Sequence, residues 1–493
     1  MSLDPLSGVE RRAIAHRGGG VSGVGPISPY SAPEVLVVTA LAAVVGLLIA
    51  NGSYLALAAA FGLPLAFALA AAFRSSPTTT LLALWVFLLL QTTLVALIGE
   101  QSRAGNLVSA IENPVLLVIA FVAVWALVAS RPAGWSLVIV AGGGFLLSGL
   151  ISDVASEVNL GQSLVGAFLG LKLYLILAIT LVIPWDEQLT SKVTRVVIGG
   201  AVLAGIAGIL DFLSGGHFRD LFAIAPKERL GHVAAGGIFR NVAILGTFMA
   251  IGVTVLLGVA RHRLLRLDFV RLAIMAVAGA LTLRLKVIVG LPAGILALAL
   301  ANRQARGRSA LALAVGVVAL LAAGGLVTSV IDRQASRYSS SDLPRDRLLT
   351  ASGEIASANA PLGIGFGQFG SLPSIWKSEY SPVYADYGLA NHYGFRPTDD
   401  VSFALDTSWP TILGESGIVG LTFYAGGLIV LLVMLLRRAR AGTGRSAELA
   451  GTAFAVLCVV LIDSAARATM FDSFILLTAC LFIAPALRAT NSD

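Results

Sequence analysis

The chain has 493 residues, of which 57% are hydrophobic and 12% charged, and its mean hydropathy is +0.88. Soluble proteins carry a charge on about a quarter of their residues, so this composition excludes the soluble classes. The net charge of +7 does not indicate a nucleic-acid partner, because most basic residues lie in short segments between apolar runs, as in membrane proteins.

The first segment, residues 1–32, is polar and glycine-rich and contains Arg11, Arg12 and Arg17. It lacks the apolar region and the cleavage site of a secretory signal peptide. We therefore expect a flexible cytoplasmic tail.

Apolar runs of about 17 to 25 residues recur from there to the end of the chain, and each is long enough to cross a bilayer. Lipid offers the backbone no hydrogen bonds and the runs are too long for barrel strands, so we predict helices. The fold class is an all-α polytopic membrane protein with about 12–14 transmembrane helices. The predicted spans are 33–50, 54–73, 78–98, 115–130, 134–151, 163–184, 195–214, 239–260, 271–284, 287–301, 309–331, 410–436, 448–464 and 471–488.

The basic segments predict an orientation. With the N-terminus in the cytoplasm, the segments 261–271, 303–308 and 437–445 all fall on the cytoplasmic side, as the positive-inside rule requires. This holds only if 271–284 and 287–301 are two separate short helices. Both termini are then cytoplasmic.

The same topology places two long polar segments outside. One is 214–239, within the helical part 33–331, and the other is 332–409, which precedes the last helical part, 410–493. Outer segments are usually poor in Lys and Arg, but both of these contain several. We therefore expect the chemistry of the protein at this side of the membrane.

The larger outer segment contains the string GFGQFG, residues 365–370, which formally matches a dinucleotide-binding motif. No strand–turn–helix unit surrounds it, so we reject a dinucleotide site. We expect a tight turn that returns the chain to the membrane.

Lys172 is a candidate binding residue because it lies about nine residues into a predicted helix, roughly 14 Å deep. A charge at that depth costs a few kcal/mol unless it faces a polar cavity or a partner. The alternatives are a contact with a substrate and a structural pair with an intramembrane acid such as Asp211.

Four further basic residues lie close to predicted outer helix ends. Arg284 and Lys286 flank the break between two short helices, and Arg229 and Arg240 precede the helix near 239–260. A helix N-terminus with basic side chains favours anions, and guanidinium groups bind phosphate with two hydrogen bonds. These residues suit a multivalent anion, such as the diphosphate of a lipid-linked sugar, although Arg240 and Lys286 can equally reach lipid headgroups.

A sugar hydroxyl needs a base before it becomes a good nucleophile. The candidate catalytic residues are Asp406, which precedes the helix beginning near Pro410, Glu415 in that helix, and His392, the one histidine of the segment 332–409. Asp406 also fits a helix N-cap. Cys458 and Cys480 suggest no disulfide or metal site, and we expect neither a metal nor a cofactor.

Four segments in order resemble the O-antigen ligase and O-antigen polymerase superfamily of bacterial envelope glycosyltransferases. They are RLGHVAAGGIFRNVAILG (229–246), GALTLRLKVIVG (279–290), LLTASGEIASANAPLGIGFGQFGS (348–371) and DTSWPTILGESGIVGL (406–421). The resemblance covers residues 165–436. The serine of the family's Thr-x-Ser-Arg element is absent, and Asp406 stands where ligases carry a histidine.

The resemblance implies a GT-C-like, metal-independent, inverting enzyme of the bacterial cytoplasmic (inner) membrane. It would transfer a glycan from an undecaprenyl diphosphate carrier to an acceptor sugar hydroxyl at the outer leaflet. Arg229 and either Arg284 or Lys286 would bind the diphosphate, Asp406 would orient or deprotonate the acceptor, and Glu415 would belong to the supporting helix. The missing histidine favours a polysaccharide polymerase over a ligase that passes the glycan to a lipid or protein.

Other classes explain part of the pattern. A flippase or transporter of lipid-linked oligosaccharides accounts for many helices and intramembrane charges but not for the large outer segment, and matching broken helices in two halves are not evident. A peptidoglycan-type polymerase would use similar donor chemistry, whereas a membrane scaffold would leave the outer basic residues unexplained.

Overall fold

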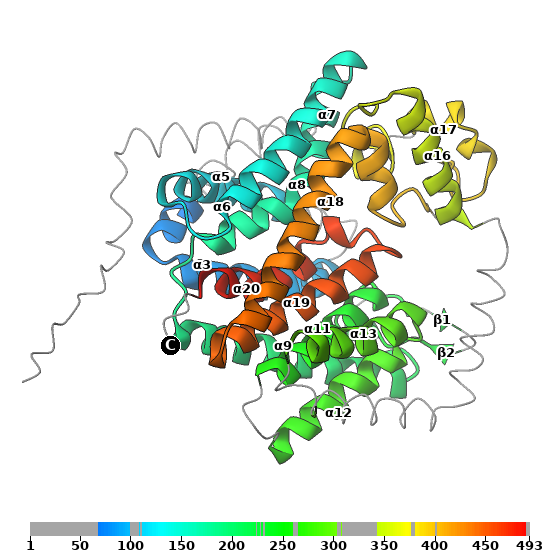
Figure 1. Ribbon diagram of the computed structural model, residues 1–493. Helices are drawn as coiled ribbons and strands as arrows, with labels where there is room; N and C mark the ends of the chain where they lie inside the picture. The colour runs from blue at the N-terminus through cyan, green and yellow to red at the C-terminus, as the bar shows by residue number, and fades with distance from the viewer. Residues whose placement is uncertain are drawn as a thin grey trace, which may run out of the picture.

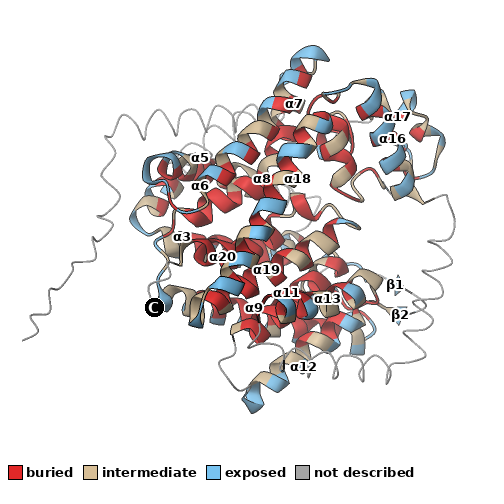
Figure 2. Ribbon diagram, viewed as in Figure 1, coloured by how far each residue is buried: buried red, intermediate tan, exposed pale blue. Residues whose placement is uncertain are grey.

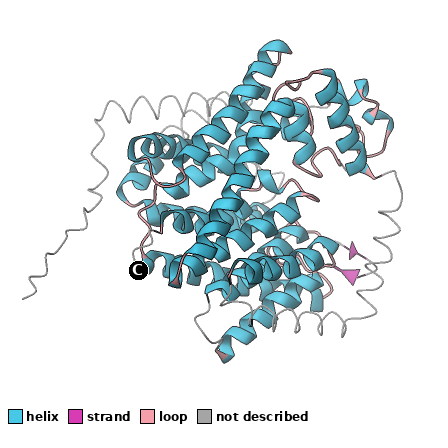
Figure 3. Ribbon diagram, viewed as in Figure 1, coloured by secondary structure: helices cyan, strands magenta, loops and turns pink. Residues whose placement is uncertain are grey.

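The computed structural model describes residues 68–98, 111–259 (except 223, 227, 230 and 231), 265–302, 343–375, 380–399 and 402–489, and the isolated positions 108 and 307. The expected N-terminal tail, the predicted spans 33–50 and 309–331 and most of 54–73 lie outside these residues. Over the described chain the fold is helical, with one short antiparallel pair of strands, β1 (Glu228–Arg229) and β2 (His232–Val233) (Figure 1, Figure 3).

Eight helices of the described chain are long and apolar enough to cross a membrane. They are α3 (Pro77–Ile98), α5 (Glu112–Ser130), the run of α6 (Trp135–Leu137), η1 (Val138–Gly142) and α7 (Gly143–Ala155), α8 (Leu160–Leu181), α9 (Glu187–Leu213), α11 (Val242–Val259), α18 (Trp409–Ala441) and α19 (Gly444–Ser464).

Three shorter helices fill other predicted spans, namely α12 (Arg266–Leu281), α13 (Leu285–Ala301) and α20 (Ser473–Arg488). The chain between α12 and α13 leaves the helical conformation, and Leu283 has a φ of 52°. The two helices are therefore separate, as the charge pattern predicts. Eleven of the fourteen predicted spans have a helical counterpart, and the other three are those at least partly outside the described residues.

The helices differ in how far their neighbours enclose them. The most apolar stretch is 89% buried in α11 and 83% in α8, but only 39% in α3 and 33% in α18. Buried residues accordingly gather in the middle of the bundle (Figure 2). Small residues allow close packing there, since a Cβ added at Gly258 of α11 would lie 2.0 Å from the Thr452 hydroxyl of α19.

The predicted span 410–436 corresponds to α18, but this helix is broken at Gly417. This residue has a φ of 66° and a ψ of −168°, a conformation that favours glycine. The backbone N–H groups of Ile364 and Gly365 donate to the Gly414 and Glu415 carbonyls, at 3.1 and 3.0 Å. The break is thus filled by residues 363–371, which contain the string GFGQFG and are called the glycine-rich segment below.

The described part of the predicted outer segment 332–409 folds into a small helical unit. It contains α16 (Pro344–Ala358), η3 (Leu372–Ile375), α17 (Val383–Asp386) and η4 (Leu389–Asn391), beside the start of α18 (Figure 1). It has its own hydrophobic core, built from Leu348, Ile355, Phe369, Tyr384 and Phe395 among others.

The glycine-rich segment anchors this unit to the bundle. Gly365, Gly367 and Gly370 all have positive φ, as expected for a tight turn. A Cβ added at Gly166 of α8 would lie 2.3 Å from the Gly367 nitrogen. The backbone of the segment therefore packs directly against α8. A larger residue in place of Gly166 or Gly367 would prevent this close approach.

Candidate functional site

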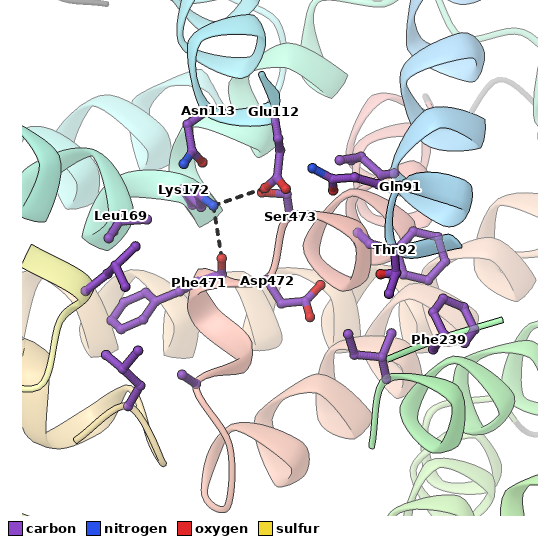
Figure 4. Close-up of a pocket in the computed structure, with 16 residues that line it drawn as sticks. Gln91, Thr92, Glu112, Asn113, Leu169, Lys172, Phe239, Phe471, Asp472 and Ser473 are labelled. Atoms are coloured by element: carbon purple, nitrogen blue, oxygen red, sulfur yellow. Dashed lines mark hydrogen bonds and ion pairs between the residues drawn. The ribbon is translucent and has the colours of Figure 1, made fainter. Parts of the chain in front are cut away.

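A cavity of about 340 Å³, lined by both polar and apolar side chains, lies among the helices of the bundle (Figure 4). Its walls come from α3, α5, α8, α11 and α20, from the segments that precede α11 and α20, and from Leu372 and Leu405 of the predicted outer segment. The polar side chains that line it are Gln91, Thr92, Glu112, Asn113, Lys172, Asp472 and Ser473.

Lys172 has both a polar cavity and a partner, the two conditions under which a deep charge is tolerated. Its Nζ lies 3.2 Å from Glu112 Oε1 and donates to the Phe471 carbonyl at 3.2 Å (Figure 4). The Ser473 hydroxyl also donates to Glu112 Oε1. Only 5% of the lysine side chain and 18% of the glutamate side chain are exposed.

Asp211 is not the partner of Lys172. It lies 3.8 Å from Arg219, and both side chains are fully buried. Asp211 Oδ2 accepts hydrogen bonds from the Gly236 and Gly237 amides at 2.8 and 3.0 Å. Burial without a fully compensating partner lowers the pKa of Arg219. The alternative of a structural pair between Lys172 and Asp211 is thus wrong, because each residue has another partner.

A chain of ion pairs runs from the start of α13 to the cavity. Lys286 Nζ lies 2.9 Å from Asp463 Oδ1, and Arg467 Nη1 lies 3.7 Å from Asp463 Oδ2. Arg467 also contacts Asp472, which lines the cavity. Arg284, the other candidate at this break, is the N-cap residue of α13. Lys286, at the helix break, is thereby connected to the cavity.

Asp406 and His392 contact arginines of α16. Asp406 Oδ2 lies 2.5 Å from Arg345 Nε, and His392 Nε2 contacts Arg347. Asp406 does not cap α18, since Ser408 is the N-cap residue and no side-chain cap bond forms. Neither residue lines the cavity, although Leu405, the neighbour of Asp406, does.

Glu415 is enclosed by the glycine-rich segment. Its Oε1 accepts hydrogen bonds from the Phe369 amide at 3.0 Å and from the Ser371 hydroxyl at 2.6 Å. The residue is 2% exposed. This arrangement favours the supporting role of Glu415 over direct contact with a substrate.

The two remaining predicted basic residues lie near the start of α11. Arg229 belongs to β1, and its side chain lies outside the described residues. Arg240 is exposed, and its carbonyl accepts a hydrogen bond from Arg219 at 3.1 Å. The residue before it, Phe239, lines the cavity.

Sequence reasoning missed Glu112, Asp463, Arg467 and Asp472. Each lies in or beside an apolar run, which is the same signal that identified Lys172. Arg467 and Asp472 lie in the short connection 465–472, which is less conspicuous than the longer polar segments 214–239 and 332–409. No group of three or more His, Cys, Asp or Glu side chains in the described chain is placed to hold a metal ion.

The fold defines a helical membrane protein that crosses the bilayer several times. No protein-family model matches the chain, and the search of curated proteins found no similar sequence. The function must therefore be inferred from the site.

Proposed function

We propose that the protein is a polysaccharide polymerase of the O-antigen ligase and polymerase superfamily. It transfers a glycan from undecaprenyl diphosphate to an acceptor sugar hydroxyl, with inversion and without a metal. The observation that supports this best is that the chain of ion pairs that begins at Lys286 ends at the cavity around Lys172. Both adjoin the helical unit of the large polar segment.

The diphosphate binds beside the start of α13. Lys286 and Arg467 flank Asp463, and Arg284 adds a third basic side chain at the N-terminus of this helix. Helix N-termini and guanidinium groups both favour phosphate oxygens.

The charge pattern favours the outer side for this end of the bundle, and the resemblance to the superfamily implies the outer leaflet of the bacterial cytoplasmic membrane. The lining residues of α5, α11 and α20 lie at the N-terminal ends of these helices, which are outer ends in the predicted topology. A membrane-embedded carrier would reach the site from the bilayer with its diphosphate at the surface. The missing histidine at position 406 favours a polymerase over a ligase.

The test uses full-length protein in lipid nanodiscs with the undecaprenyl diphosphate glycan pool of its own source. We expect release of undecaprenyl diphosphate and a ladder of longer glycans. Lys286→Met and Arg467→Met should each reduce this transfer at least about tenfold, the equivalent of about 1.4 kcal/mol. Lys192→Met is the matched control, because Lys192 is exposed on α9 near the predicted cytoplasmic end.

Other outcomes separate the alternatives. A single glycan block added to a lipid or protein would identify a ligase. Movement of labelled carrier lipid between leaflets without carrier release would refute the enzyme and support a flippase. Loss of transfer in the Lys192 control as well would mean that the variants report on protein quality and not on a diphosphate site.

A further inference from the structure

The cavity differs in charge from the neighbouring cluster of basic residues. Among the sixteen described residues that line it, Lys172 is the one basic side chain, and Glu112 and Asp472 are carboxylates. Lys172 is already paired with Glu112 at 3.2 Å. Asp472, the second carboxylate, is paired with Arg467. Both charged contacts at the wall are therefore compensated within the described chain, so the cavity suits a neutral ligand better than an anion.

The other lining groups suit a ligand rich in hydroxyls. Thr92 and Asn113 contribute hydroxyl and amide groups, Gln91 and Ser473 contribute polar groups that already have partners, and aromatic side chains such as Phe239 complete the wall. Asn113 Oδ1 is buried and accepts no hydrogen bond from the described residues. A buried acceptor without a donor is unfavourable, so a ligand hydroxyl that donates to it would bind favourably.

Glu112 is placed to act on such a hydroxyl. Its carboxylate reaches into the cavity between Lys172 and Ser473, which both contact Oε1 (Figure 4). These two contacts fix its orientation, and the ammonium compensates its charge. Asp406, in contrast, pairs with Arg345 at 2.5 Å and does not line the cavity.

We propose that the cavity binds the acceptor sugar and that Glu112 accepts the proton of the attacking hydroxyl. This inference rests on the proposed glycosyl transfer. The hydroxyl oxygen forms a bond to the anomeric carbon of the donor, and the bond between that carbon and the diphosphate oxygen breaks. The electron pair leaves with undecaprenyl diphosphate, and the proton passes to the Glu112 carboxylate.

The first test measures transfer and donor binding separately in nanodiscs. Glu112→Gln keeps the size of the side chain but removes the base, so transfer should fall about 100-fold or more. Binding of undecaprenyl diphosphate without a glycan should stay within about twofold, because the diphosphate contacts lie elsewhere. Transfer within about threefold of the wild type would overturn the role of Glu112.

The matched control is Glu187→Gln. Glu187 is the first residue of α9 and contacts a basic residue, Arg445, as Glu112 is the first residue of α5 and contacts Lys172. It does not line the cavity, so this variant should transfer glycan at the wild-type rate.

Chemical rescue distinguishes a base from a packing residue. Glu112→Ala removes the carboxylate and leaves space, so added formate should restore part of the transfer, whereas neutral formamide should not. Two results would make Glu112 a structural residue and overturn the proposal. One is equal rescue by formate and formamide, and the other is no rescue by either compound together with a loss of donor binding.

A second measurement tests the sugar subsite without transfer. Glycan freed from its carrier by mild acid should bind to the wild type and at least about tenfold more weakly to Asn113→Leu, which lacks the buried acceptor. If the wild type binds the free glycan but releases no carrier, the proposed polymerase fails and the subsite stands. If it releases carrier but the glycan does not bind, the subsite is wrong and the polymerase stands.

Discussion

Two regions of the bundle contain acids within apolar helices, and they use them differently. Asp211 and Glu415 are enclosed, at 0% and 2% exposure, and both accept hydrogen bonds from backbone amides of connecting segments. Glu112 instead contacts the side chains of Lys172 and Ser473 at the wall of a cavity, with 18% of its side chain exposed.

The comparison shows that a charge inside a membrane helix is not by itself a binding site. A carboxylate that satisfies backbone amides fixes the course of the chain and has little capacity left for a ligand. A carboxylate held by side chains beside a cavity keeps both access and an anchored orientation. The hydrogen-bond partner of a carboxylate and its access to a cavity, more than its depth in the membrane, therefore distinguish a structural carboxylate from a candidate catalytic one.

Arg219→Met should have the largest effect on stability. It leaves Asp211 buried without its countercharge and removes donors from the Phe239 and Arg240 carbonyls. Breaking a buried pair costs about 3–5 kcal/mol. Thermal unfolding in detergent measures the loss, and adding Asp211→Asn should recover part of it. A loss below about 1 kcal/mol would show that the enclosed pair is not a structural clamp.

Glu415→Ala should have the second-largest effect on stability. The Phe369 amide and the Ser371 hydroxyl lose their acceptor, and each unsatisfied buried donor costs about 1–3 kcal/mol. Hydrogen exchange should increase over residues 363–371, which the carboxylate anchors. Glu415→Gln retains an acceptor oxygen and should lose less. Unchanged exchange in the alanine variant would contradict the anchoring role.

Lys172→Met should destabilise the fold less than Arg219→Met, by about 1–3 kcal/mol, because the cavity lets water approach the remaining carboxylate. A double-mutant cycle with Glu112→Gln should show that the two side chains are coupled. Additive losses would mean that the contact at 3.2 Å contributes nothing to stability.

Glu187→Gln should have the smallest effect. Glu187 and Arg445 are 66% and 36% exposed, and exposed pairs contribute at most about 1 kcal/mol. Added salt should remove the difference from the wild type in thermal unfolding. A larger loss that persists in salt would contradict the distinction between enclosed and exposed pairs.

Much of the fold could be predicted from the sequence because lipid imposes a simple rule. Every backbone polar group must find a partner within its own helix, so apolar length predicts spans such as α8 and α11 directly. The break at Gly417 is an exception. The Gly414 and Glu415 carbonyls at this break accept hydrogen bonds from the amides of Ile364 and Gly365. These residues lie about 50 residues earlier in the chain, and a local sequence pattern does not reveal such a distant partner.

The site was only partly predictable. Lys172 and Lys286 are predictable because a charge within or beside an apolar run is conspicuous. Arg467, in a short connection beside an apolar run, is conspicuous for the same reason. Their partners, Glu112 and Asp463, come from helices far away in the sequence. The sequence offered an intramembrane acid such as Asp211 as one alternative for the partner of Lys172, and the structure shows that the acid is Glu112.

The sequence by itself determined the class of protein, the positions of most helices and the end of the bundle at which basic residues gather, because composition and charge act locally. Only the tertiary structure decided which acid meets which base, that the glycine-rich segment fills the break in α18, and that a cavity opens beside Glu112. These depend on packing between helices distant in the chain, where small residues and backbone amides set the approach.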